Sequence, residues 1–217
     1  MHKKTRDSEL TKAKIIQNAM KLFSKKGYDA TTADDVAKAC DINKAMIFYY
    51  YKNKAGLYGA VMSEALSSIH EEITKQERVS TSPIVDLEVF IKTYALYCQK
   101  HSYLPALLLR ELSDSGAHLP EMTFSSMRKL FALLSKILMD GEKEKIFSNI
   151  EPMVIYFMIV GTLNLFITTQ ALREKATQIQ DNLNTCSDCA MDDIAEYIFK
   201  KIKLMLEVPD ETNNTCS

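Results

Sequence analysis

Apolar residues recur every three or four positions along most of the chain, which is the spacing of amphipathic helices. The first such segment ends at Gly27, and Asp7 or Ser8 is placed to cap its start. A second long segment begins after Asn53 and is broken by the Ser-Thr-Ser-Pro sequence at residues 80–83. The apolar positions of these two predicted helices are Ile15, Ile16, Ala19, Met20, Leu22 and Phe23, and then Leu57, Val61, Ala65, Ile69 and Ile73.

Two short helices are predicted between the long ones. Thr32, with Asp35 three residues later, forms a capping box that opens a helix of about two turns. Asp41 suits the left-handed backbone of a tight turn, and Asn43 is a strong N-cap for a helix that begins at Lys44. Two short helices joined by such a turn, behind a supporting first helix, form a helix-turn-helix, whose second helix enters the major groove of DNA.

The sequence IFYYY, residues 47–51, favours a strand by residue preference alone. The cap at Asn43 instead predicts a helix, in which Ile47 and Tyr51 share one apolar stripe and face the protein. Tyr49 lies on the opposite side and Tyr50 on its flank, so their hydroxyls are placed to reach phosphate oxygens. The aromatic residues therefore divide between packing and DNA contact.

The rest of the chain is also predicted to be helical. Helix starts fall at residues 82–83, 102–105, 118–120 and 149–152, and the polar residues 173–185 are either a helix end or a loop. Ser187 or Asp188 is placed to cap a last amphipathic helix that runs to about Glu207. The fold class is therefore all-α, with about nine helices: a three-helix DNA-binding domain at residues 1–56, and a helical domain at residues 57–210.

Charge is distributed unevenly along the chain. Residues 1–60 hold 12 Lys+Arg against 6 Asp+Glu, whereas the remainder holds 15 against 22. A basic segment on an acidic body indicates that the first part meets a polyanion. Residues 1–14 are expected to form a basic arm, which either reaches phosphates or is a solvated tail.

Other function classes find little support. The five cysteines suggest no disulfide framework and favour a cytoplasmic location, and only Cys186 and Cys189 have metal or redox spacing. Residues 153–167 are too short and too interrupted for a membrane span, and no secretory signal is present. The sequence shows no catalytic motif, so we expect no enzyme, no catalytic residue, no cofactor and no metal site.

The segment from Thr11 to Leu57 resembles the tetracycline-repressor (TetR) family of bacterial regulators. The resemblance rests on Leu22-Phe23-Ser24-Lys25-Lys26-Gly27-Tyr28, Thr31-Thr32, Val36-Ala37, Asp41-Ile42-Asn43, Phe48-Tyr49-Tyr50-Tyr51, and Lys54 with Leu57. The sequence departs from the family pattern at Asp41, Ala45, Met46, Phe48 and Tyr51. At Met46 and Phe48 the departure removes a hydroxyl, which puts direct DNA contact by these two residues in doubt.

The resemblance implies an operator on double-stranded DNA. By similarity, phosphate contacts are carried over to Thr32, Tyr49, Tyr50 and Lys54, and base or groove contacts to Lys44 and Ala45, at the helix tip capped by Asn43. It also implies a homodimer, formed by the apolar helix after residue 152 and by the last helix.

The resemblance further implies a small-molecule effector, and aromatic and methionine side chains suit a lipophilic one. The candidate ligand-binding residues are Tyr94, Tyr97, Phe124, Met127, Phe131, Phe157, Met158 and Asn164, each of which is equally well explained as filled core. The leading hypothesis is a repressor released from a palindromic operator by this effector. The alternatives are a redox- or metal-responsive regulator that uses Cys186 and Cys189, and a DNA-binding protein without an effector.

Overall fold

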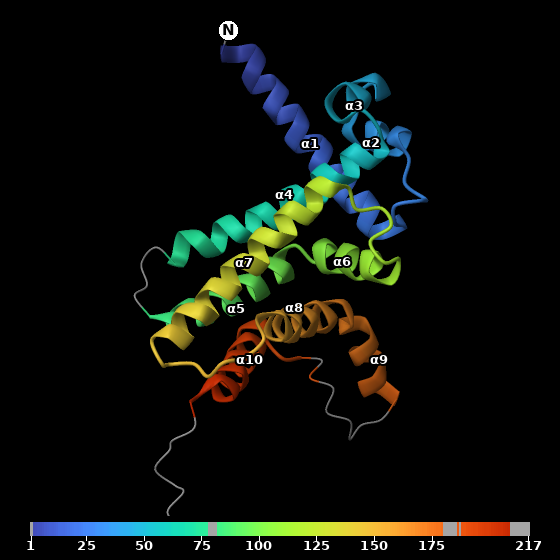
Figure 1. Cartoon of the computed structure of the whole chain (residues 1–217). Helices are drawn as coiled ribbons and strands as arrows, with labels where there is room; N and C mark the ends of the chain where they lie inside the picture. The colour runs from blue at the N-terminus through green and yellow to red at the C-terminus, as the bar shows by residue number, and fades with distance from the viewer. Residues whose placement is uncertain (1, 78–81, 180–185, 187, 209–217) are drawn as a thin grey trace, which may run out of the picture. The chain divides into compact units, whose positions relative to one another are not determined.

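The computed structural model describes residues 2–77, 82–179, 186 and 188–208, with side chains from residue 7 onwards. In that part of the chain the regular elements are ten α-helices (Figure 1), with a single isolated antiparallel bridge between Phe147 and Glu207. The helices are α1 (His2–Lys26), α2 (Ala33–Cys40), α3 (Lys44–Tyr51), α4 (Lys54–Glu77), α5 (Pro83–Lys100), α6 (Tyr103–Ser113), α7 (Glu121–Lys143), α8 (Pro152–Thr168), α9 (Gln170–Ile179) and α10 (Met191–Leu206). The all-α prediction is confirmed.

Two of the predicted helix starts are wrong. Helix α1 begins at His2, so neither Asp7 nor Ser8 caps it, because no helix breaker precedes them and the residues from Lys3 onwards tolerate a helix. Helix α10 has Ala190 as its N-cap, without a capping side chain, in place of Asp188. Ser187, the other predicted cap, lies outside the described residues.

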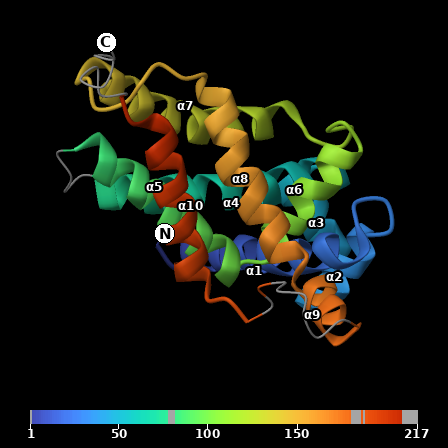
Figure 2. The same cartoon turned by 90° about the horizontal axis from the view of Figure 1, so that it is seen from below.

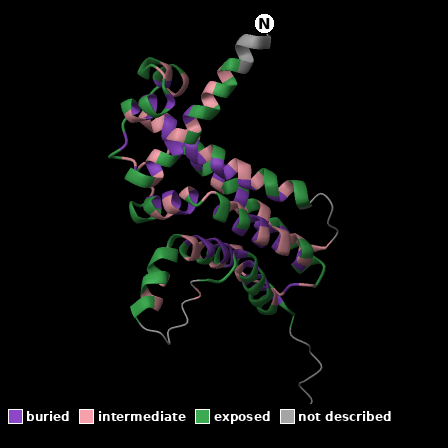
Figure 3. Ribbon diagram, turned by 180° about the vertical axis from the view of Figure 1, so that it is seen from behind, coloured by how far each residue is buried: buried purple, intermediate pink, exposed green. Residues whose placement is uncertain are grey.

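The polar segment after α8 contains a helix of its own. Helix α9 occupies Gln170–Ile179 and buries none of its residues, which is visible as a run of exposed positions in Figure 3. This helix is the element that the expectation of about nine helices lacked. Its residues are mostly polar, which explains why the sequence left a helix end and a loop as alternatives.

The chain divides into two compact units. The first comprises Met1–Ser68 and His101–Arg128, and in it α1 packs against α2 and α6 while α2 packs against α3. Its core contains the fully buried side chains of Ile15, Phe23 and Ile47. This unit carries the helix-turn-helix.

The second unit comprises Ile69–Lys100 and Lys129–Ser217. Here α10 runs beside α5, and α8 contacts both of them, as Figures 1 and 2 both show. Tyr94 on α5 is fully buried and donates a hydrogen bond to the side-chain oxygen of Asn164 on α8, at 3.0 Å. Burial raises the pKa of the Tyr94 hydroxyl well above its usual value.

Helix α4 contributes residues to both units. Its five predicted apolar positions, Leu57, Val61, Ala65, Ile69 and Ile73, are all buried. The step of four residues along α4 therefore identified its core-facing side correctly.

Within the described ranges, no single helix is long and apolar enough to cross a membrane. Helices α8 and α9 meet the length and composition criterion only when taken together, and the chain bends by 61° between them.

One disulfide bond was not anticipated. Cys186 and Cys189 are joined across three positions, with their Cα atoms 5.1 Å apart. The expectation of no disulfide framework therefore misses a local bond within the Cys-x-x-Cys sequence. Cys40 and Cys98 are free and buried.

Candidate nucleic-acid interface

The start of α2 is fixed by the capping box that the sequence predicts. The Thr32 hydroxyl accepts a hydrogen bond from the Asp35 backbone N–H at 3.1 Å, and the Asp35 carboxylate accepts one from the Thr32 backbone N–H at 3.0 Å. These hydrogen bonds, from the Thr32 backbone first, lower the pKa of the Asp35 carboxyl. Thr32 is exposed at a helix N-terminus, where backbone N–H groups favour a phosphate.

The turn between α2 and α3 also forms as predicted. Asp41 is left-handed, with φ 52° and ψ 51°, and its backbone N–H closes the end of α2. Asn43 then caps α3, accepting a hydrogen bond from the Ala45 backbone N–H at 2.8 Å. Because both sides of this turn are fixed by hydrogen bonds, α3 leaves α2 in a defined direction.

Helix α3 has one side that packs against the protein and one side that is exposed. Ile47 is fully buried, and Tyr51 is half-buried with its hydroxyl donating to the Lys12 carbonyl at 3.4 Å. Burial raises the pKa of Tyr51 to about 12. On the other side, Tyr49 is 81% exposed and Ala45 is exposed as well. The predicted packing of Ile47 and Tyr51 and the exposure of Tyr49 are confirmed, whereas DNA contact by the exposed side stays a prediction.

Tyr50 lies between α3 and the first helix. Its ring meets Tyr49 edge-on with 5.1 Å between centroids, and its hydroxyl accepts a hydrogen bond from Ser8 on α1 at 3.3 Å. The Lys12 ammonium is 5.9 Å from the centre of the same ring. Helix α1 therefore supports one of the two tyrosines predicted to contact phosphate and leaves the other exposed.

Phe48, the other aromatic of α3, is 42% exposed, and the Lys44 ammonium lies 5.7 Å from its ring centre. The same ammonium pairs with the Asp34 carboxylate of α2 at 2.6 Å. Both partners are exposed, so the pair is weak and exchangeable in water. Lys44 is thus held at the tip of α3 by contacts that a phosphate or a base can replace.

Lys54 has a structural role that the sequence did not indicate. Its ammonium donates to the backbone carbonyls of Tyr28 at 3.2 Å and Asp29 at 3.3 Å, and lies 4.2 Å from the centre of the Tyr28 ring. The first residue of α4 is therefore attached to the turn between α1 and α2. Removing this side chain would disturb that turn as well as any phosphate contact.

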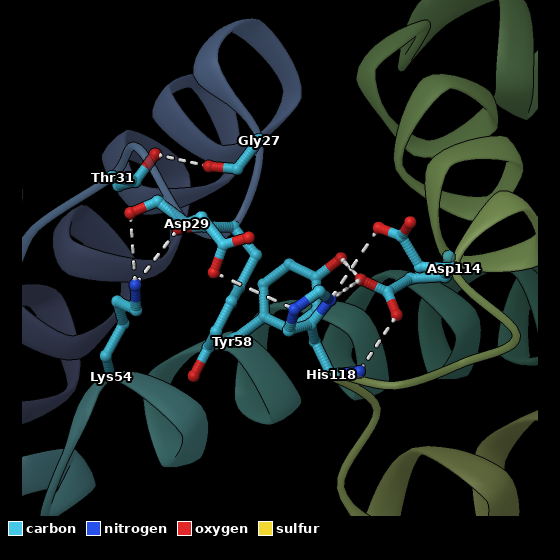
Figure 4. Close-up of polar contacts among 9 residues, drawn as sticks. Gly27, Asp29, Thr31, Lys54, Tyr58, Asp114 and His118 are labelled. Atoms are coloured by element: carbon cyan, nitrogen blue, oxygen red, sulfur yellow. Dashed lines mark hydrogen bonds and ion pairs between the residues drawn. The ribbon is translucent and has the colours of Figure 1, made fainter.

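Beside this turn lies a cluster that the sequence analysis did not identify (Figure 4). Glu111 on α6 is 3% exposed and accepts a hydrogen bond from the Tyr58 hydroxyl at 2.7 Å. His118, from the loop before α7, places its ring 4.5 Å from that of Tyr28. A cleft of about 490 Å³ opens here. The signal in the sequence was an acidic residue on a mainly apolar helix.

The predicted effector residues differ widely in exposure. Phe124 is 51% exposed and Phe157 is 58% exposed, whereas Tyr94 and Asn164 are buried and bonded to each other. Four more are half-buried: Tyr97, Met127, Phe131 and Met158. The Phe131 ring meets Tyr156 edge-on with 5.5 Å between centroids. The ligand-binding role of all eight stays a prediction.

The first unit therefore carries a capped helix-turn-helix with an exposed tyrosine on its second helix, which is the architecture of a DNA-binding motif. Residues 15–61 match the model of the bacterial regulatory proteins of the tetR family. This match covers the helix-turn-helix and less than half of the chain.

Two curated relatives are similar to parts of the chain. The probable HTH-type transcriptional regulator YttP of Bacillus subtilis is 29% identical over 137 residues, which are 62% of this chain and 66% of that protein. IcaR, the negative transcriptional regulator of the biofilm operon icaADBC in Staphylococcus epidermidis, is 55% identical over 47 residues. That match covers 22% of this chain and 25% of IcaR, so the likeness to IcaR concerns one domain.

Solved structures share the fold over nearly the whole chain. The fatty acid degradation regulator FadR from Bacillus halodurans has a TM-score of 0.70 and 20% identity, covering 88% of this chain and 97% of that one. FadR from Bacillus subtilis, solved in complex with stearoyl-CoA, has a TM-score of 0.72 and 16% identity, covering 90% and 99%. At this identity the likeness shows the fold alone.

Proposed function

We propose that this protein is a dimeric transcriptional repressor that binds a palindromic operator through α2 and α3. The observation that carries the proposal is the recognition helix itself, which is capped at Asn43, packed through Ile47 and exposed at Tyr49. Phosphate contacts are assigned to Thr32, Tyr49, Tyr50 and Lys54, and groove contacts to Lys44 and Ala45. Residues 1–56 supply DNA binding and residues 57–210 supply dimerisation and effector binding.

The DNA-binding proposal can be tested without knowing the operator. A duplex selected by the purified protein from a random-sequence library serves as the probe, and binding should weaken steeply as salt rises. Tyr49→Phe removes one hydroxyl that is assigned to a phosphate, so affinity should fall about tenfold.

The matched control for this test is Tyr103→Phe. Tyr103 lies on α6, where its hydroxyl meets the His101 ring nitrogen at 2.9 Å, so removing this hydroxyl should leave DNA affinity unchanged. Equal affinities for wild type, Tyr49→Phe and Tyr103→Phe would show that the Tyr49 hydroxyl does not contact DNA.

The dimer is proposed to form through α8 and α10. Val154, Phe157 and Leu165 recur at helical spacing on α8, and their side chains are 51%, 58% and 53% exposed. On α10, Leu204 is 61% exposed and Met205 is 47% exposed. Contiguous apolar surface of this kind marks an interaction site, and a twofold dimer uses the same surface on both copies. Such a dimer would place its recognition helices about 34 Å apart.

Phe157→Glu tests this interface. A charge at the centre of an apolar contact should convert the dimer to a monomer, as measured by sedimentation or light scattering. Leu112→Glu, at a residue that is 63% exposed on α6, is the matched control and should leave the mass unchanged. A Phe157→Glu protein that remains dimeric would exclude this face of α8.

A small, mainly apolar effector is proposed to release the operator. The support is the set of half-buried aromatic and methionine residues, together with the shared fold of a FadR solved with stearoyl-CoA. Effector binding is expected to lower operator affinity by a coupling of about 1 to 3 kcal/mol.

Native mass spectrometry of the purified protein should reveal a bound apolar molecule, and a series of acyl-CoA esters should displace the selected duplex. Coenzyme A without an acyl chain is the control. If no bound molecule is found and no ester releases DNA, the effector-independent alternative replaces this one.

A second candidate is a redox-responsive regulator, and the bonded pair Cys186 and Cys189 favours it. Reduction of this disulfide by a dithiol would yield two cysteine thiols and oxidise the dithiol to its own disulfide. Operator affinity would be measured with and without dithiothreitol in the wild type and in Cys186→Ser. Equal affinity of the wild type in both conditions excludes this function.

A further inference from the structure

The His118 imidazole lies among three carboxylates within the unit that carries the helix-turn-helix (Figure 4). Its Nε2 atom is 3.8 Å from Asp29, in the turn between α1 and α2. Its Nδ1 atom is 3.5 Å from Glu111 on α6 and 3.9 Å from Asp114, which caps the end of that helix. Both ring nitrogens therefore face negative charge.

The Nδ1 atom is buried and makes no hydrogen bond among the described residues. A neutral imidazole carries a proton on one nitrogen only, whereas an imidazolium donates from both. Only the protonated ring can thus satisfy Asp29 on one side and Glu111 on the other. Protonation would give the buried Nδ1 atom a hydrogen to donate to Glu111. A hydrogen bond between two charged groups is stronger than one between neutral groups, so it would hold the ring more firmly.

The other charged groups around this site come from several elements. The His118 ring lies against Tyr28, whose ring has the Lys54 ammonium 4.2 Å from its centre. Tyr58 on α4 donates a hydrogen bond to the same Glu111 oxygen that faces His118 Nδ1, and Lys26 and Arg110 line the same cleft. The three carboxylates face the imidazole directly, whereas Lys54 is separated from it by the Tyr28 ring.

We propose that His118 is a positioning residue for operator binding, and that its protonation clamps the turn between α1 and α2. The turn leads directly into Thr32 and receives Lys54, two residues assigned to phosphate contact. If the turn is already held in place before DNA binds, less conformational entropy is lost on binding. Operator affinity therefore rises as pH falls through the range in which histidines gain their charge.

This inference rests on the proposed DNA-binding function. Affinity for the selected duplex would be measured at fixed salt between about pH 8 and pH 5.5, the range over which histidine charge changes. The wild type should gain roughly threefold to tenfold in affinity over this range, the size expected for one or two partly exposed ion pairs.

Two variants separate the clamp from general effects of pH. His118→Phe keeps an aromatic ring against Tyr28 but carries no proton, so its affinity should not show this gain. Asp29→Asn removes the carboxylate that faces Nε2 and should also reduce the gain. His70→Asn, at a half-buried histidine on α4, is the matched control and should show the same gain in DNA affinity as the wild type when pH falls.

A second measurement does not depend on DNA. Hydrogen exchange of the backbone amides in residues 28–32 should slow as pH falls in the wild type relative to His118→Phe at the same pH. If the wild type selects no DNA but shows this protection, the proposed function is contradicted. The clamp on the turn is supported in that case. Equal protection, or equal pH dependence of affinity in wild type and His118→Phe, would overturn the clamp.

Discussion

At the scale of single residues, the first unit contains a buried hydrogen bond whose stabilising effect depends on both of its partners. The hydrogen bond from Tyr58 to Glu111 joins α4 to α6, and both side chains are nearly inaccessible, at 1% and 3% exposure. A buried polar atom is stabilising only while its partner is present. Substitution of one partner should therefore cost more than an ordinary surface change.

Tyr58→Phe should lower the free energy of unfolding by about 1 to 3 kcal/mol, because it leaves a Glu111 oxygen without its donor. Urea unfolding checks this value. Tyr197→Phe, on an exposed side chain, should change the same quantity by less than about 0.5 kcal/mol. Equal losses for the two variants would mean that the Tyr58 hydroxyl has no stabilising role.

At the scale of elements, the end of α7 depends on a close approach between a glycine and an aromatic ring. A Cβ atom on Gly141 would overlap the ring of Phe147, which is 3% exposed. The backbone N–H groups of Ile146 and Phe147 both bond the Gly141 carbonyl, which folds the chain back over the helix end. Gly161 on α8, by contrast, has open space around its Cβ direction.

The two glycines should respond to alanine with opposite signs. Gly161→Ala should stabilise the isolated subunit by about 0.5 to 1 kcal/mol, because alanine restricts the unfolded chain and favours helix. Gly141→Ala should destabilise by about 1 to 3 kcal/mol through overpacking against Phe147. Thermal or urea unfolding measures both, and a stabilised Gly141→Ala protein would contradict the packing of Phe147 described here.

At the scale of the whole molecule, buried tyrosines link stability to alkaline pH. Burial raises the pKa of Tyr51 and of Tyr156 to about 12, and it also raises the pKa of Tyr58 and of Tyr94. Because each folded value lies above the unfolded value of about 10, the unfolded chain loses these protons first. The stability that these groups contribute is complete below about pH 10 and is lost as pH rises above it.

The free energy of unfolding should therefore fall steeply between about pH 10 and pH 11.5, while phenolate absorbance lags behind that of the urea-unfolded protein. Tyr51→Phe should make this fall shallower, because one of the tyrosines with a raised pKa is then absent. If the folded and unfolded proteins titrate together, the hydroxyls are not buried as described.

Sequence alone determined the local structure of the helix-turn-helix. The Thr32 and Asn43 caps, the left-handed Asp41 and the buried Ile47 all follow from chemistry within a few residues, so short-range pattern was sufficient. Long-range contacts were decided only by the tertiary structure. Three contacts, the attachment of Lys54 to the turn, the packing of the His118 ring against Tyr28 and the hydrogen bond from Tyr58 to Glu111, each join residues tens of positions apart. Helix α9 was also established only by the structure, because it buries no residue and its mostly polar composition is equally typical of a loop.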